Sequence, residues 1–277
     1  MRYKTTLQKI CIYSLAVITF IVALFPFWWM MISSLKPSHE IFSKVPTFWP
    51  RNVTFEHYTN IFVRANFWGY FKNSLLVAGT VTVIGTGIAS LAGYALGRFP
   101  LRGKEMILLT VLFVQMFPLV VLIIPLFIIM SQLNLTNSLV GLVITYLTFS
   151  LPFCIWMLRS YFSSIPIEIE EAALIDGCTR MQAFRKVIFP LAWPGISATS
   201  IFAFITAWNE FVFAVTFIKD DQLRTLPLAL QQFFSRFTAD YGGLMAASTI
   251  ATIPVLLFFM FFQKRMTKGL VQGSVKH

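Results

Sequence analysis

The residues that could carry out chemistry in this sequence are few and lie far apart. The three histidines, His39, His57 and His277, share no local pattern with one another or with the three cysteines. Hydrolases and metalloenzymes place such residues at set spacings, and no HExxH or GxSxG pattern occurs. The phosphate-binding pattern GxxxxGK[ST] is also absent, because Gly103-Lys104 is followed by Glu105. The sequence therefore predicts a chain that is not an enzyme and does not itself hydrolyse ATP.

An acidic segment between two long apolar runs has residue types suited to binding a partner. It reads Ile165-Pro-Ile-Glu-Ile-Glu-Glu-Ala-Ala-Leu-Ile-Asp-Gly177. Pro166 suits the first turn of a helix, and the three glutamates place negative charge near its positive N-terminal end. Gly177 can adopt the left-handed conformation that ends a helix. This pattern predicts a short helix from Pro166 to Asp176.

A second short helix is predicted immediately downstream. Thr179-Arg-Met-Gln182 has the pattern of a capping box, and the chain re-enters an apolar run near Pro190. The small side chains of Ala172 and Ala173 let another backbone or a groove approach closely, and Glu171 offers a charge to a basic partner. Helices that lie on lipid usually carry Lys and Arg on their polar face, so an acidic helix favours a protein partner over the interfacial alternative.

The elements that position this segment are apolar enough to be membrane helices. Hydrophobic residues make up 57% of the 277 residues and charged residues only 12%, against about 25% charged in soluble domains. A helix needs ~20 apolar residues to cross a bilayer. The prediction is an all-α membrane protein, one transmembrane domain over residues 1–277, with the acidic loop at 159–190. The predicted spans are about 10–34, 74–96, 106–130, 139–158, 191–217 and 243–262.

Charge and cysteine content agree with a membrane chain. The net charge is +11, and with the N-terminus inside, fourteen Lys and Arg fall in inside segments against eight outside. This bias predicts that both termini lie in the cytoplasm, although Lys36 and Lys72 flank helices on the opposite side. The cysteines are interpreted as small apolar side chains. Two outside loops, Pro37–Phe71 and Lys219–Tyr241, either dock an extracytoplasmic partner or cap the helices.

Glu210 is the one acidic residue well inside a predicted span, next to Trp208 and Asn209. A carboxylate in a membrane helix is by default a functional hypothesis. Aromatic rings and amides suit a sugar, so direct contact with substrate is one interpretation. The alternative is that Glu210 pairs across the helices and holds an outer gate. Gln115 in the third span is a weaker candidate for the pathway.

The acidic loop resembles the EAA motif of the permease subunits of ABC importers. In that motif Glu-Ala-Ala is followed after three residues by Gly and nine residues later by Ile-x-Leu-Pro. This chain has Glu171-Ala-Ala173, then Gly177 at the same spacing, then Val187-Ile-Phe-Pro190. The two departures exchange one apolar residue for another.

Further motifs are similar to those of one branch of the family, the importers of maltose, trehalose and glycerol-phosphate type. Within that branch the chain looks like the second, six-helix permease. The motifs are Ser34-Leu-Lys-Pro37, Asn73-Ser-Leu75, Met116-Phe-Pro118, Trp208-Asn-Glu-Phe211 and the tail Gly269-Leu-Val-Gln-Gly-Ser-Val-Lys276.

The resemblance implies a type I ABC importer fold and several partners. Two permeases would form the pathway, two cytoplasmic ATPases that bind ATP and Mg²⁺ would drive it, and an extracytoplasmic binding protein would deliver a sugar-like solute. No cofactor or metal is expected in this chain. The resemblance assigns the coupling helix, which sits in a groove of the ATPase, to Glu171, Ala172, Ala173, Asp176 and Gly177, with Pro190 at its re-entry.

Three other functions remain as alternatives. A permease of the same class could carry another solute, such as an amino acid or a polyamine, although the fifth-span and tail motifs favour a sugar. An ion-coupled secondary transporter usually has several intramembrane carboxylates and internal repeats, which are not visible here. A membrane enzyme would need a catalytic constellation that the sequence does not contain.

Overall fold

The structure is a computed structural model, and it describes residues 6–64, 66–233 and 240–273. These residues form helices joined by turns and loops, with no strand among them. The helices in chain order are α1 (Thr6–Ser34), α2 (Ser38–Ile41), α3 (Glu56–Arg64), α4 (Phe67–Arg98), α5 (Lys104–Met116), α6 (Leu119–Gln132), α7 (Leu139–Ser164), α8 (Ile167–Ile175), α9 (Arg180–Ala183), η1 (Phe184–Ile188), α10 (Phe189–Leu191), α11 (Trp193–Trp208), α12 (Val212–Phe217), η2 (Asp221–Leu223), α13 (Leu226–Leu230), η3 (Gln231–Phe233) and α14 (Tyr241–Gly273).

Four of these helices, α1, α4, α7 and α14, are individually long and apolar enough to cross a membrane. Two bent pairs have the same property when each is taken as one span. The first pair is α5 with α6, bent by 101°, and the second is residues 180–191 with α11, bent by 75°. Counting each pair as one span makes six in the described part of the chain. The chain is therefore an all-α, multi-pass membrane protein, as the sequence predicted.

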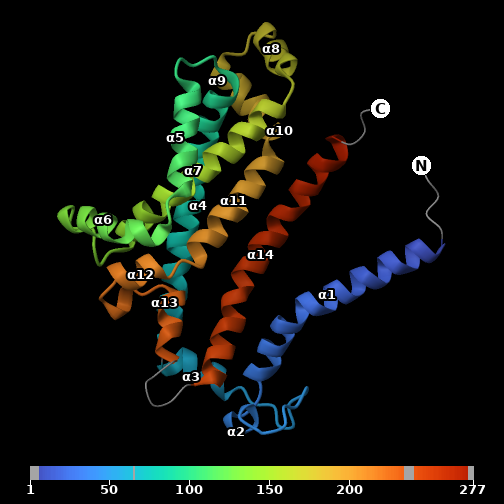
Figure 1. The fold of residues 1–277 in the computed structure, drawn as a ribbon, viewed down its shortest axis with the longest axis vertical. Helices are drawn as coiled ribbons and strands as arrows, with labels where there is room; N and C mark the ends of the chain where they lie inside the picture. Colours follow the sequence, from blue (N-terminus) through green and yellow to red (C-terminus); the bar gives the residue numbers. More distant parts are fainter. Residues whose placement is uncertain (1–5, 65, 234–239, 274–277) are drawn as a thin grey trace. The chain divides into compact units, whose positions relative to one another are not determined.

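The described chain divides into two compact units. The first comprises residues up to 67 together with residues 230–253, and the second comprises residues 68–229 and the chain from Pro254 onward. In the second unit α8 and α9 lie at one end and α12 lies at the other (Figure 1).

The first unit contains a loop whose charged groups are buried. Lys36 is 3% exposed, donates to the Thr47 carbonyl, and lies 4.6 Å from the centroid of the Trp29 ring. The His57 ring is hydrogen-bonded through Nε2 to the Lys36 carbonyl at 2.9 Å. Part of the Ser34–Pro37 motif therefore builds this loop, which accounts for a lysine at a position that the charge bias does not favour.

In the second unit α4 and α7 approach closely through glycines. A Cβ added to Gly93 would lie 2.9 Å from the Arg159 backbone nitrogen, and one added to Gly97 would lie 3.3 Å from the Arg159 carbonyl. These glycines are four residues apart, so they lie on one face of α4. Small residues at this spacing let membrane helices pack backbone to backbone. The ends of α4 and α7 next to α8 are therefore packed tightly against each other.

The segment after α12 is fastened to the beginning of α4. The Asn73 amide donates to the carbonyls of Gln222 and Arg224 at 2.8 and 3.0 Å. The Ser74 hydroxyl accepts from the Leu226 backbone N–H at 2.7 Å. The Asn73–Leu75 motif thus holds one of the two long loops in place.

The predicted spans need correction at three places. Helix α4 begins at Phe67, seven residues before the predicted start, so Asn73 lies inside the helix. The predicted span 106–130 is interrupted at Phe117, because Pro118 has an extended backbone and begins a new helix. The predicted span 191–217 ends as α11 at Trp208, and α12 starts after a break at Asn209–Phe211. Of the tail motif, residues 274–276 lie outside the described residues.

Candidate functional site

Helix α8 has the boundaries that its sequence predicts. Pro166 precedes its first residue, and Gly177 has φ +86°, the left-handed conformation. The Gly177 N–H donates to the Leu174 carbonyl, and the Cys178 N–H donates to the Ala173 carbonyl. This pair of bonds is a Schellman motif, which satisfies carbonyls at the end of a helix. The short predicted helix and the role of Gly177 in ending it are confirmed.

The second helix of the loop begins with the predicted capping box. The Thr179 hydroxyl accepts from the Gln182 backbone N–H at 3.3 Å, and the Gln182 side chain accepts from the Thr179 N–H at 2.8 Å. Helix α9 continues into the π-helix η1 and then α10, which contains Pro190. Proline has no N–H to donate, and the wider π-helical turn immediately before it changes the bonding ladder there.

The two faces of α8 differ in what they contact. Glu171 and Ala172 are exposed, as are Asp176 and Gly177 just after the helix. The side chain of Ile175, at the end of the helix, is 86% exposed, which is unusually high for a large apolar residue. We call these five residues the outer face of α8. Glu170 and Ala173, three positions apart, are buried on the opposite side.

The buried side of α8 is joined to the end of α4 by a carboxylate. Glu170 Oε1 accepts a hydrogen bond from the Tyr94 hydroxyl at 2.5 Å, and Oε2 lies 3.3 Å from Arg98 Nε. The side chains of Arg98 and Glu170 are only 6% and 5% exposed. The predicted role of Glu170 was limited to the charge of the first turn, so this contact was missed.

Aromatic rings surround this contact. The Tyr94 ring centroid lies 5.5 Å from that of Phe99, 5.9 Å from that of Phe162 and 4.5 Å from that of Phe184. Tyr94 lies near the end of α4 and Phe99 directly follows that helix. Phe162 belongs to α7 and Phe184 to η1. Arg180, the first residue of α9, lies over the Phe99 ring at 5.4 Å. The core of the second unit thus continues from the membrane helices into the loop that carries α8.

The break after α11 places Trp208, Asn209 and Glu210 in three different environments. Trp208 is 3% exposed and stacks on Phe204 at 5.6 Å between ring centroids. Asn209 is exposed at the end of α11. The Glu210 carboxylate accepts from the backbone N–H groups of Phe213 and Ala214, at 2.8 and 3.2 Å. Glu210 therefore caps the free N–H groups at the start of α12.

Gln115 and Glu210 both approach one turn of α7. The Gln115 amide donates to the Phe149 carbonyl at 3.3 Å. The Tyr146 hydroxyl, one turn earlier, faces the Glu210 carboxylate without reaching hydrogen-bond geometry. Phe149 also stacks on Phe213 of α12 at 5.6 Å. The structure brings these two predicted residues to the same turn of α7.

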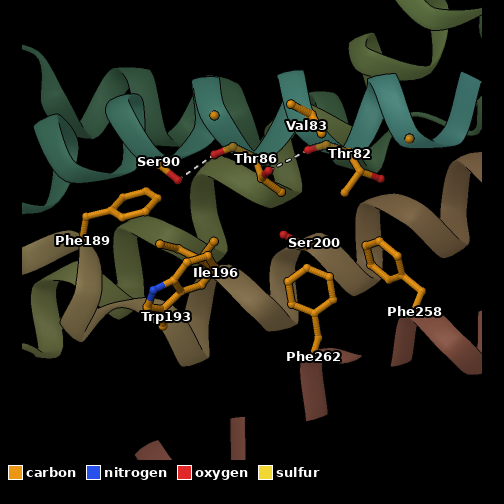
Figure 2. A pocket seen from close by; sticks show the side chains of 12 residues that line it. Thr82, Val83, Thr86, Ser90, Phe189, Trp193, Ile196, Ser200, Phe258 and Phe262 are labelled. Atoms are coloured by element: carbon orange, nitrogen blue, oxygen red, sulfur yellow. Dashed lines mark hydrogen bonds between the residues drawn. The ribbon is translucent and has the colours of Figure 1, made fainter. Parts of the chain in front are cut away.

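A hollow of about 360 Å³ lies between α4, α10, α11 and α14 (Figure 2). The hydroxyls of Thr82, Thr86 and Ser90 line it from α4, but each donates to the carbonyl four residues earlier in its own helix. The rings of Phe258 and Trp193 face it from the other side. The hydroxyls are already occupied, so the hollow is mainly apolar. Elsewhere in the described residues, no group of three or more His, Cys, Asp or Glu side chains could hold a metal ion.

Two features of the site went unpredicted. The Glu170 contact depends on Tyr94 and Arg98, which lie far away in the sequence. The exposure of Ile175 could have been read from spacing, because Ile175 is four positions after Glu171 and so shares its helical face. Glu170 is one position from Glu171 and five from Ile175, so it does not share their face.

Comparison with known proteins identifies the family. Residues 85–272 match the model of the binding-protein-dependent transport system inner membrane component. This match covers more than half of the chain and includes the loop that carries α8. The chain belongs to this family, and it is a permease subunit of a binding-protein-dependent ABC importer.

Full-length relatives support the same class. The chain is 40% identical over 261 residues to the diacetylchitobiose uptake system permease protein DasC of Streptomyces coelicolor, covering 94% of this chain and 95% of the relative. It is 35% identical to the trehalose/maltose transport system permease protein MalG of Thermococcus litoralis, with 99% of each chain covered. It is 37% identical to the trehalose transport system permease protein SugB of Mycobacterium tuberculosis, with 92% and 93% covered.

Solved structures support the fold. A chain of a bacterial ABC transporter involved in the import of the polysaccharide alginate matches with a TM-score of 0.78 at 22% identity, over 95% of this chain and 99% of the other. A chain of the MetNI methionine ABC transporter matches with a TM-score of 0.60 at 17% identity, over 78% of this chain and 99% of the other. At these identities the likeness concerns the fold, which is that of type I importers.

Proposed function

We propose that this permease forms half of the membrane pathway of an ATP-driven importer for a carbohydrate or carbohydrate-like solute. The sugar assignment is supported by relatives covering nearly the whole chain, which are named for diacetylchitobiose, trehalose and maltose uptake. The pathway motifs in the Trp208–Phe211 segment point the same way. A second permease subunit supplies the other half, and residues 1–277 act as one transmembrane permease domain.

The proposed mechanism depends on the exposed residues of the outer face of α8. It combines a free carboxylate, a small residue and a projecting apolar side chain, in Glu171, Ala172 and Ile175. We assign this face to the groove of a cytoplasmic ATPase subunit. Ile175 would enter an apolar pocket there, and Glu171 would meet a basic side chain. Ala173 instead packs within the chain, so it supports the helix from behind.

This assignment also sets the orientation of the chain in the membrane. With α8 in the cytoplasm, both termini lie in the cytoplasm and the loops after α1 and α12 face outward. ATP and Mg²⁺ bind to the ATPase subunits, and this chain holds no cofactor. An extracytoplasmic solute-binding protein delivers the substrate to the outer loops. The alginate importer supports this last partner by analogy, since one of its structures contains an alginate-bound periplasmic protein.

Glu210 and its neighbours belong to the outer half of the pathway in this proposal. The Glu210 carboxylate caps α12 and faces Tyr146, so we assign it to a gate that holds α12 against α7. Asn209 is exposed beside it and is available to a solute hydroxyl. Gln115 lies on the adjoining part of α5. Trp208 supports this region through its stack on Phe204.

The test is purification of a tagged chain from its native membrane in mild detergent, with identification of its partners. We expect a second permease, an ATPase and a solute-binding protein, and the ligand of that binding protein names the solute. A stable chain recovered alone in the absence of any ATPase would contradict the proposal and favour an ion-coupled transporter. A binding protein specific for an amino acid or polyamine would overturn the sugar assignment alone.

A further inference from the structure

Two adjacent glutamates of α8 point to opposite sides of the helix. Glu171 lies on the outer face, whereas Glu170 is 4% exposed. A buried carboxylate is costly unless its charge is paired and its oxygens accept hydrogen bonds. Glu170 has a charged partner in Arg98 and one hydrogen-bond donor in Tyr94, and both come from α4. Its position is therefore tied to a membrane helix rather than to its own loop.

The two partners lie on one face of α4 at its last turn. Tyr94 and Arg98 are four residues apart, so their side chains stand above one another on the helix surface. Arg98 is the last residue of α4, where a cation is favourable at the negative helix end. Glu170 belongs to the first turn of α8, where an anion is favourable. The pair therefore joins the end of one helix to the start of another.

The surroundings of the Glu170–Arg98 pair leave little room for water to solvate either charge if the two separate. Phe99, Phe162 and Phe184 enclose the Tyr94 ring, and the charged side chains are almost fully buried. In such low-dielectric surroundings a charge that loses its partner is strongly unfavourable. Separating α8 from α4 is thus disfavoured, and a displacement of α8 carries α4 with it. Because Gly93 packs α4 against the α7 backbone, the displacement extends to a second membrane helix.

The link also has hydrogen-bonding capacity that this arrangement does not use. Arg98 Nε and Nη2 and Glu170 Oε2 are buried and make no hydrogen bond to the described residues. The 3.3 Å ion pair therefore falls short of the hydrogen-bonded geometry that an arginine and a carboxylate can adopt. Buried polar groups left in this state call for an explanation, and a second arrangement of the same pair provides one.

We infer that Glu170 is a positioning residue that, through Arg98 and Tyr94, transmits movement of α8 to α4 during transport. This inference rests on the proposed function, because the ATPase supplies the movement at the outer face of α8. It divides the loop into a receiving side at Glu171 and Ile175 and a transmitting side at Glu170. The transmitting side requires no contact with the ATPase or with solute.

The experiment uses the assembled importer in proteoliposomes, with ATP hydrolysis and solute uptake measured on the same vesicles. The solute is the ligand identified on the copurified binding protein. Glu170→Gln keeps the side-chain size and removes the charge. We expect normal assembly and ATP hydrolysis, with uptake per ATP reduced about tenfold, the range of a coupling between two sites. Tyr94→Phe keeps the ring and removes one hydrogen bond, with an expected reduction of about fivefold.

Two further variants separate transmission from folding. Glu105→Gln makes the same chemical change at an exposed position of α5, and uptake per ATP should stay at the wild-type value. The double variant Glu170→Gln with Arg98→Gln removes both buried charges, so it should assemble even if Glu170→Gln alone does not. It should still transport poorly per ATP, because neutral groups do not hold α8 to α4 in the same way.

The outcomes distinguish this inference from the proposed function. Absence of ATP-driven uptake by the wild-type complex would refute the proposed function itself. Wild-type uptake per ATP in Tyr94→Phe or in the double variant would overturn the role of Glu170 and leave the proposed function standing. Reduced uptake with retained hydrolysis in both would support transmission, since a merely structural defect lowers both activities together.

Discussion

Two buried carboxylates, Glu40 in α2 and Glu170 in α8, have almost the same low exposure but different partners. Glu40 accepts from the Thr47 hydroxyl and the Arg51 backbone N–H, which are 7 and 11 residues away. The hydroxyl bonded to Glu170 is 76 residues away. The first carboxylate closes a local loop, whereas the second joins separate elements. Equal burial therefore says little about function until the partners are known.

The difference extends to electrostatics. Glu40 is satisfied mainly by neutral donors, which stabilise its ionised form. The Thr47 hydroxyl and then the Arg51 N–H hold the pKa of the Glu40 carboxyl below its ordinary value of 4.5. Glu170 faces a full guanidinium charge in an aromatic environment. Loss of the Glu170 carboxylate thus leaves a buried cation, while loss of the Glu40 charge leaves only weaker hydrogen bonds.

The largest effect is expected from Glu170→Ala. This change leaves Arg98 buried without a partner, and breaking such a pair from one side costs about 3–5 kcal/mol. We expect a clearly lower unfolding midpoint for the purified complex in mild detergent. Glu168→Ala, at an exposed position of the same helix, is the matched control and should unfold like the wild type. Equal midpoints for the two variants would remove the distinction between the two sides of α8.

Gly93→Ala is expected to have the next largest effect. Its Cβ would lie 2.9 Å from the Arg159 backbone nitrogen, so α4 and α7 must separate. Overpacking of this kind costs about 1–3 kcal/mol. The control is Gly79→Ala in the same helix, where no atom lies within 4 Å of the added Cβ. Both unfolding midpoints are measured. A higher midpoint for Gly93→Ala than for Gly79→Ala would contradict tight packing of α4 against α7.

Glu210→Gln is expected to impair uptake while leaving assembly intact. The amide keeps one oxygen acceptor, so the variant loses the charge and one of the two N–H contacts at the start of α12. Loss of a helix cap costs about 0.5–2 kcal/mol, which is enough to loosen a gate without unfolding the chain. Solute uptake and copurification of the partners provide the two measurements. Unchanged uptake would refute the gate assignment.

The smallest effect is expected from protonation of Glu40. Because its folded pKa is lowered, its contribution to loop stability is complete above its ordinary pKa of 4.5 and is lost as the pH falls through the lowered value. The protection factor of the Arg51 N–H, which compares its exchange with that of an unfolded chain at the same pH, should therefore fall in acid but stay high at neutral pH. In Glu40→Gln this pH dependence should disappear. A pH dependence that persisted in the variant would assign the effect to another group.

The parts of the structure that could be predicted depend on neighbours in the sequence. The end of α8 at Gly177 and the capping box at Thr179 follow local rules, and long apolar runs indicate the spans. The breaks at Phe117 and Asn209 were missed because hydropathy records apolar character and not the path of the backbone. The Glu170 contact could not be predicted, because it exists only after α4 and α8 have come together. The assignment of Glu171 to the ATPase stays a prediction.

The central claim is that the outer face of α8 receives the ATPase, and site-specific photo-crosslinking tests it most directly. A photoreactive residue at Ile175, which is 86% exposed, should capture the ATPase subunit in the native membrane. The same residue at Met106, which is 69% exposed at the start of α5, serves as the control and should not. Capture from Ile175 alone is the predicted result. Capture from Met106 alone, or no ATPase from Ile175 in an importer that transports normally, would contradict the account.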